Sequence, residues 1–228
     1  FAKPFNLSLA CPTPGAAIRY TIDGSAPSLT NGLLYTNLIG INGTRVIRAA
    51  AFRSSSLPSK VTTHTYLYNQ SPLRRTLPAL SLVTASNHLY GKTGIMEYNP
   101  RNTLKHGLAW ERPVSAEWIE PKDNGGFQID CGLRIQGGGY IRSLYNYRSG
   151  AIPESKYSFR LYFRGDYGEG RLRQAIFPGV PVDSFDTIVL RAGMNDATNP
   201  FLRNEFARQL EADVGQVSAR GTFVHLFL

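Results

Sequence analysis

The chain has 228 residues, of which 42% are hydrophobic and 18% are charged, enough for one or two packed domains. Its 22 glycines, 14 prolines and 11% aromatic residues favour strands joined by turns over a helical bundle. No apolar run approaches the roughly 18 residues that a membrane-spanning helix needs, so the sequence predicts no membrane span.

The formal net charge of +9 is concentrated near the amino terminus. Residues 1–75 hold eight Lys or Arg and one acid, Asp23, whereas residues 76–228 hold seventeen basic and fifteen acidic residues. Such a basic region could contact nucleic acid or an anionic surface polymer. Because its basic residues are scattered and form no run with interleaved aromatics, we favour solvated strand faces and expect no nucleic-acid partner.

Short segments of alternating polarity predict a small β-sandwich in the first part of the chain. Strands are expected at residues 5–9, 18–22, 45–52 and 61–67, with turn signals at 12–15, 23–25, 31–32 and 42–43. No helical period occurs here, which favours an antiparallel sandwich. The predicted core residues are Phe5, Ile18, Tyr20, Ile22, Val46 and Phe52.

Three strings in this region carry a resemblance: IRYTIDGSAP at 18–27, LYT at 34–36 and VIRAAAF at 46–52. In this order they resemble the fibronectin-III-associated module, also called the chitobiase/β-hexosaminidase C-terminal-like domain. The resemblance implies an immunoglobulin-like sandwich over residues 1–68 that accompanies other domains and has no chemistry of its own. Asp23 and Ser25 could be ligand groups, but an Asx-Gly turn requires them for backbone geometry alone, and we favour that interpretation.

Residues 69–78 form a polar, proline-bounded linker, and a second domain is expected over residues 79–228. Its predicted strands are at 79–83, 113–119, 129–135, 157–163 and 186–190, with loops at 87–95 and 98–102. One helix is predicted over 198–215, with Asn199 as cap, Pro200 in the first turn and Gly215 at the end. The apolar strand at 222–228 has no closing turn, so we expect the chain to continue beyond Leu228.

Seven strings in the second domain carry another resemblance. They are LPALSLV at 77–83, YGKTGI at 90–95, WERPVSAE at 110–117, GLRIQGG at 132–138, KYSFRLYF at 156–163, LRAG at 190–193 and FLRNE at 201–205. Together they resemble the spore-coat-protein-H (CotH) family of atypical, secretory-type protein kinases. The expected fold class is therefore mainly β with some α: a small antiparallel sandwich followed by an incomplete α+β kinase-like domain.

The same resemblance implies a function. It predicts a protein kinase of a secreted or cell-surface bacterial protein, which acts on a protein substrate or meets a surface polymer, with ATP and Mg²⁺ as cofactors of the full-length protein. The family's catalytic and metal-binding acids would lie beyond Leu228, so residues 1–228 alone are predicted to be inactive and to hold no tightly bound cofactor or metal. The competing hypothesis is a non-catalytic surface or carbohydrate-associated protein that retains this fold as a scaffold.

Five residues are candidates for nucleotide binding: Gly137, Gly138, Gly139, Lys156 and Glu205. Phosphoryl transfer needs groups that hold phosphates, such as the backbone N–H groups of a glycine-rich turn and a nearby cation. The glycines could equally be a plain turn between strands, and Lys156 a solvated strand residue. Glu205 occupies the family position of the glutamate that holds the lysine.

Other chemistries find little support in the sequence. The strings GxxxxGK[ST], HExxH, CxxC and GxSxG are absent, and the four histidines are too dispersed to suggest a metal centre. The acid pair Glu117 and Glu120 could serve glycoside hydrolysis, but its context equally fits a solvated strand end. The two cysteines, Cys11 and Cys131, are interpreted as small buried residues, and their disulfide state stays open.

Overall fold

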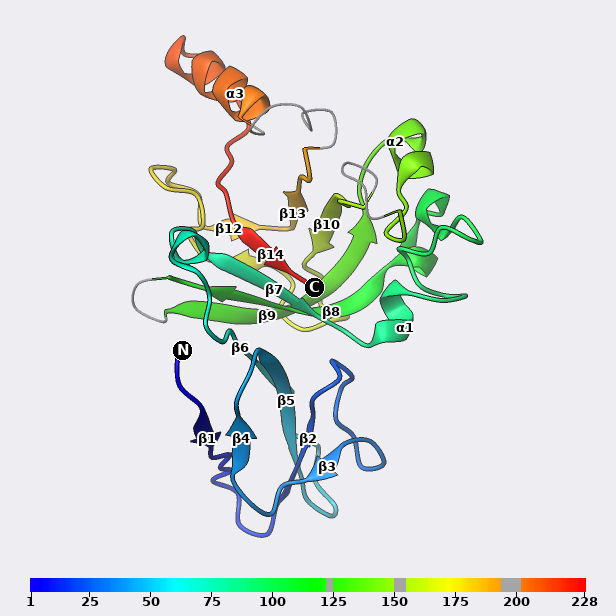
Figure 1. Cartoon of the computed structure of the whole chain (residues 1–228), viewed down its shortest axis with the longest axis vertical. Helices are drawn as coiled ribbons and strands as arrows, with labels where there is room; N and C mark the ends of the chain where they lie inside the picture. Colours follow the sequence, from blue (N-terminus) through cyan, green and yellow to red (C-terminus); the bar gives the residue numbers. More distant parts are fainter. Residues whose placement is uncertain (122–124, 150–154, 194–201) are drawn as a thin grey trace. The chain divides into compact units, whose positions relative to one another are not determined.

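The computed structural model describes residues 1–121, 125–149, 155–193 and 202–228, and its fold is mainly β with few helices (Figure 1). The chain divides into two compact units. The first unit contains residues 1–86, 115–129 and 224–228, and the second contains residues 87–114 and 130–223. Every helix in the described ranges is too short or too polar to cross a membrane.

The amino-terminal part of the first unit consists of two antiparallel sheets (Figure 1). One sheet pairs β1 with β4, and the other follows the order β3-β2-β5-β6. The strands are β1 Phe5–Leu7, β2 Ala17–Thr21, β3 Leu33–Leu34, β4 Ile39–Ile41, β5 Arg45–Phe52 and β6 Thr62–Tyr66. Residues 1–67 are all described and contain no helix, which confirms the predicted antiparallel strands.

The core of these two sheets differs from the predicted one. Its centre is formed by Ile39, Ile41 and Ile47, which are 6%, 0% and 3% exposed. The segment Ile39–Ile41 was not predicted as a strand because Gly40 interrupts it, yet the glycine points outward and places both isoleucines on the buried face. Residues two apart on a strand share a face, so β4 contributes two core side chains from three residues.

The predicted core list is therefore partly wrong. Phe52 is buried, and Ile18, Tyr20 and Val46 are half-buried, but Phe5 and Ile22 are exposed. Since side chains alternate along β5, burial of Ile47 turns the neighbouring Val46 away from the centre. Ile22 lies just beyond the last residue of β2 and belongs to the turn rather than to the strand.

A larger sheet has the strand order β13-β10-β9-β8-β7-β14. Its strands are β7 Ala79–Val83, β8 Arg112–Ile119, β9 Gly126–Ile135, β10 Phe159–Tyr162, β13 Thr187–Leu190 and β14 His225–Phe227. β14 pairs parallel with β7, whereas β7 and β8, β9 and β10, and β10 and β13 pair antiparallel. Each strand predicted for the second domain is present, although β10 and β14 are shorter than expected.

Short elements connect these strands. They are the 3-10 helices Pro72–Arg75, Asn102–Leu104 and Leu108–Trp110, the helices α1 Ser86–Leu89 and α2 Gly139–Leu144, and the strands β11 Leu172–Arg173 and β12 Ser184–Phe185. The predicted linker at 69–78 thus contains a helical turn, and the loop predicted at 87–95 begins inside α1. Isolated turns of this length carry no sequence period from which they could be predicted.

The predicted long helix is α3, Arg203–Asp213, the longest helix of the described residues. Asn199 and Pro200, its predicted first residues, lie outside the described residues. Its end is confirmed, because the chain leaves the helix at Gly215 with a φ of 81°, the left-handed conformation that glycine adopts most readily. The apolar stripe is exposed on the helix surface, at Leu202, Phe206, Leu210 and Val214.

Alternation along β10 gives the second unit one apolar and one polar sheet face. Phe159 and Leu161 are 2% exposed and lie opposite Ile135 and Leu133 of β9. Paired residues of antiparallel strands point to the same face, so these four side chains form one buried layer. The residue between them, Arg160, points to the opposite face, where the candidate site lies.

Candidate functional site

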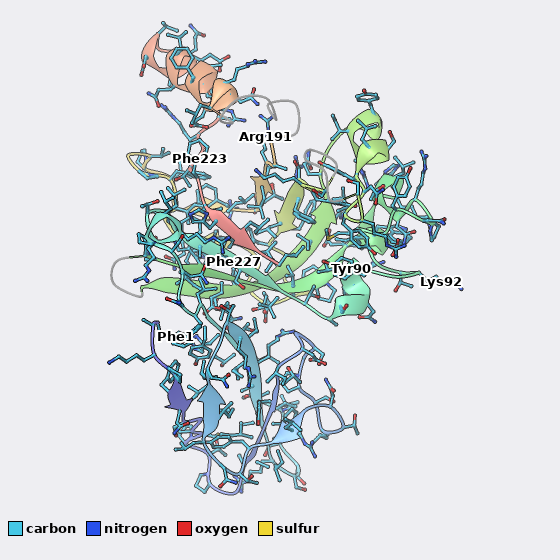
Figure 2. All side chains as sticks on the ribbon, in the orientation of Figure 1. Phe1, Tyr90, Lys92, Arg191, Phe223 and Phe227 are labelled. Carbon is cyan, nitrogen blue, oxygen red and sulfur yellow. The ribbon has the colours of Figure 1, made fainter. Side chains whose placement is uncertain are left out.

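A pocket of about 170 Å³ lies in the second unit, where the chain leaves β9 and β13 and enters β10. It is lined by Gln136, Gly137, Ile141, Tyr145, Ser158, Val189, Arg191 and Gly193. Of the five predicted site residues, Gly137 is therefore the one that lines the pocket. Arg191, which follows β13, is labelled in Figure 2.

The three glycines do not join two strands, as one interpretation of the sequence had it. β9 ends at Ile135, and Gly138 directly precedes the short helix α2. Gly137 has a φ of 130°, which strongly favours glycine, and a Cβ there would lie 3.4 Å from Cγ2 of Ile141. A Cβ on Gly138 or Gly139 would meet nothing within 4 Å, so their backbone is open.

Hydrogen bonds between backbone and side chains hold the wall of this pocket in place. The N–H of Gln136 donates to the carbonyl of Ser158 at 2.8 Å, continuing the β9–β10 ladder. The hydroxyl of Tyr145 accepts the N–H of Ser158 at 3.0 Å and donates to the Gln136 carbonyl at 3.3 Å. The Ser158 hydroxyl in turn accepts the N–H of Ala192 at 3.0 Å. Tyr145 is completely buried, so the hydrogen bonds of its hydroxyl are shielded from water.

The other two candidate residues lie outside the pocket lining. Lys156 is exposed, lies two residues before Ser158 and precedes β10 instead of beginning it. Partial desolvation lowers the pKa of the Lys156 ammonium group. Glu205 lies in the first turn of α3 and forms an ion pair with Arg208 at 3.0 Å. The roles of Lys156 and Glu205 in nucleotide binding stay predictions.

Two arginines beside the pocket were not among the predicted site residues. Arg134 of β9 lies directly opposite Arg160 of β10, and Arg160 lies opposite the pocket residue Val189 of β13. Opposite residues share a face of the sheet, so both guanidinium groups lie on the polar face that carries Gln136 and Ser158. The sequence indicates this polar face, because polar and apolar residues alternate in the strings LRIQ and YSFRLY.

Arg134 and Arg164 share one buried carboxylate. Glu111 has no exposed side-chain surface, and its Oε1 accepts a hydrogen bond from Nε of Arg164 at 3.0 Å. Arg134 Nη2 is 2.6 Å from Oε2, a charge contact without normal hydrogen-bond geometry. Both guanidinium groups also lie over the Tyr162 ring, at 4.5 and 5.0 Å from its centre. Burial, together with a hydrogen bond to Glu111, raises the pKa of Tyr167 to about 12.

Among the described residues, Arg160 has no comparable carboxylate partner. Its Nε atom is buried and has no hydrogen-bond partner among the described residues. In the part of the chain that the structure describes, no group of three His, Cys, Asp or Glu side chains could hold a metal ion. The basic side chains around the pocket fit an oxyanion such as phosphate.

Comparison with known proteins identifies the class of the first sandwich. Residues 7–66 match the family model described as Fn3 associated, which confirms the resemblance inferred from the strings at 18–27, 34–36 and 46–52. These residues therefore form a fibronectin-III-associated module. No curated protein and no solved structure matches the chain. The resemblance of residues 77–228 to spore-coat-protein-H kinases stays a prediction.

Proposed function

We propose that residues 79–228 supply the nucleotide-side part of a spore-coat-protein-H-like atypical protein kinase domain. The protein would be a secreted or cell-surface bacterial protein in which the fibronectin-III-associated module is an accessory. The observation that carries this proposal is the pocket in which the glycine turn, Ser158 and Arg191 meet on a basic sheet face. A glycine turn beside fixed cations is what a phosphate group requires.

The residues of the pocket could hold phosphate oxygens by different means. Gly137 lines the pocket and has no side chain that would keep an anion away from the backbone. Arg191 and Lys156 add positive charge near the pocket. Bound ATP would supply the transferable phosphoryl group, whereas a metal finds no set of carboxylates among the described residues. We therefore propose nucleotide binding here and no complete catalytic site.

A non-catalytic surface protein is the second candidate function. It is favoured by contacts within the first unit, where Glu117 of β8 binds the backbone of β6 in the module. A module held on the sheet through a nearly buried carboxylate suits a scaffold. The two functions differ in one measurable property, which is the binding of nucleotide.

Calorimetric titration with ATP and Mg²⁺ separates these functions. We expect weak binding by the wild-type chain and weaker binding by Lys156→Ala, whereas Lys92→Ala, an exposed lysine outside the pocket lining, retains the wild-type affinity. A Glu205→Gln variant tests the remaining candidate. If ATP fails to bind the wild-type chain at millimolar concentration, the kinase proposal is wrong and the scaffold function is favoured.

Transfer of radiolabelled phosphate tests the expected inactivity. The described residues form no set of metal-binding carboxylates, on which phosphoryl transfer depends for most of its electrostatic stabilisation, so we predict that residues 1–228 transfer no phosphate above background. Transfer that is present in the wild-type chain and absent in Lys156→Ala would contradict this expectation. It would mean that a complete catalytic site lies within these residues.

A further inference from the structure

Two positive charges face each other across neighbouring strands of the second unit. Arg134 and Arg160 are directly paired in the β9–β10 register, and both are half-buried. Like charges in this arrangement destabilise a sheet, and partial burial increases the cost because water screens the charges less. Arg134 already contacts the Glu111 carboxylate, so it is the charge of Arg160 that calls for a further anion beside the pocket.

No acid in the described ranges compensates Arg160. Glu111 is fully buried and is already shared by Arg134 and Arg164. Asp130 lies four residues before Arg134 on β9, about 13 Å away along the strand at the usual rise per residue. Arg191, in the pocket lining, adds a further positive charge. The described part of this face therefore has more guanidinium groups than carboxylates near Arg160.

We propose that Arg160 and Arg134 form a binding subsite for a phosphate-type dianion next to the pocket. The proposal rests on the proposed nucleotide-binding function and deepens it, because it names the residues that hold the phosphate on the face of the sheet. A guanidinium group offers two parallel N–H donors to two phosphate oxygens, a geometry that the ammonium group of Lys156 cannot provide. The ligand is a phosphoryl or diphosphoryl group.

The size of the pocket supports this ligand class. Pockets that enclose a small organic ligand usually have volumes of about 300–1,000 Å³. A volume of about 170 Å³ suits one or two phosphoryl groups better than a whole nucleotide. Ser158 also supports a phosphoryl ligand. Its hydroxyl accepts a hydrogen bond from the N–H of Ala192, so its own proton remains available to donate to an oxyanion.

Calorimetry at low ionic strength with pyrophosphate, ATP and adenosine tests the subsite. Pyrophosphate and ATP should bind the wild-type chain and should bind Arg160→Gln about tenfold more weakly or worse, as expected for loss of a charged hydrogen bond. Arg173→Gln, which removes an exposed arginine of β11, is the matched control and should bind like wild type. Adenosine lacks phosphate and should not respond to the substitution at Arg160.

Thermal unfolding gives a second readout that a purely structural arginine would not show. Without an anion, Arg160→Gln should be at least as stable as wild type because the repulsion with Arg134 is removed. Pyrophosphate should raise the wild-type Tm and raise the variant's Tm less. A large loss of stability in anion-free buffer would overturn the proposal, because Arg160 would then be a structural residue.

The binding data also separate this subsite from the proposed function. Pyrophosphate binding that depends on Arg160, combined with no tighter binding of ATP, supports the subsite and contradicts nucleotide recognition. ATP binding that is insensitive to Arg160→Gln supports nucleotide recognition and overturns the subsite. Failure of both pyrophosphate and ATP to bind the wild-type chain at millimolar concentration overturns both.

Discussion

The backbone N–H of Thr65 donates a hydrogen bond of 2.6 Å to Oε2 of Glu117, a residue 52 positions further along the chain. Thr65 lies on β6, the edge strand of the four-stranded sheet. Edge strands expose unpaired N–H groups that can pair with other chains. The side chain of Gln128 accepts the Thr63 N–H at 3.3 Å in the same way, so two polar side chains cover this edge within the first unit.

Replacement of Glu117 by glutamine should destabilise the first unit. The Glu117 side chain is only 9% exposed, and its other oxygen lies 3.2 Å from Nδ1 of His64. Glutamine has one carbonyl oxygen and no charge, so it cannot serve both donors equally well. We expect the free energy of unfolding to fall by about 1–3 kcal/mol, measured by chemical denaturation. Glu169→Gln, an exposed residue, should change it by less than about 0.5 kcal/mol.

The His64–Glu117 contact should also make stability depend on pH. The hydrogen bond to Glu117 raises the pKa of His64 above its ordinary value of 6.5. The stabilisation is complete below pH 6.5 and is lost as the pH rises through the folded-state pKa. We expect the wild-type chain to lose a small amount of stability between pH 6 and pH 8, small because the His64 side chain is 62% exposed.

Comparison with a His64→Gln variant isolates the titration of His64 from that of the other ionisable groups. The difference in unfolding free energy between the wild-type chain and His64→Gln should be largest at low pH and should shrink as the pH rises. A difference that is constant from pH 5 to pH 9 would show that the ion pair makes no contribution to stability.

Local patterns predicted much of the fold, because alternation and turn residues act over a few positions. The strands at 79–83 and 113–119 and the helix end at Gly215 follow from such short signals. The strand Ile39–Ile41 was missed because three residues with a central glycine are too short to show a period. On β5, Val46 was assigned to the core in place of Ile47, whereas Phe52 was assigned correctly.

Less of the candidate site than of the fold could be predicted from the sequence. Gly137 could be chosen from its glycine-rich string, but the pocket also needs Val189 and Arg191, which reach it through strand pairing with β10. The pairing of Arg134 with Arg160 depends on the β9–β10 register, which spans an intervening segment of more than twenty residues. No local pattern specifies that register before the sheet is known.

The two cysteines should differ sharply in reactivity. Cys131 is 0% exposed, and burial raises the pKa of its thiol far above the ordinary value, so little reactive thiolate forms. Cys11 is half-buried, and both thiols are free. Ellman's reagent should therefore label one thiol in the native chain and both after denaturation. Cys11→Ser should abolish the native reaction; labelling of two thiols at one rate would contradict the burial of Cys131.

Gly132 should be intolerant of even a single added methyl group. It lies on β9 opposite Tyr162, above the buried carboxylate that Arg134 and Arg164 share. A Cβ at this position would lie 2.5 Å from Oε1 of Glu111 and 2.6 Å from its Cγ, closer than any stable contact. The carboxylate cannot retreat without loss of its ion pairs. We expect Gly132→Ala to lower the unfolding free energy by about 1–3 kcal/mol.

A double-mutant cycle identifies the cause of this loss. Gly165→Ala is the control, since a Cβ there meets nothing within 4 Å, and it should be nearly neutral. Glu111→Ala alone should be strongly destabilising because it leaves buried positive charge without a partner. If the clash with Glu111 is responsible, Gly132→Ala should cost much less in the Glu111→Ala background than in the wild-type chain. Equal costs in the two backgrounds would mean that a Cβ at Gly132 disturbs the strand for another reason.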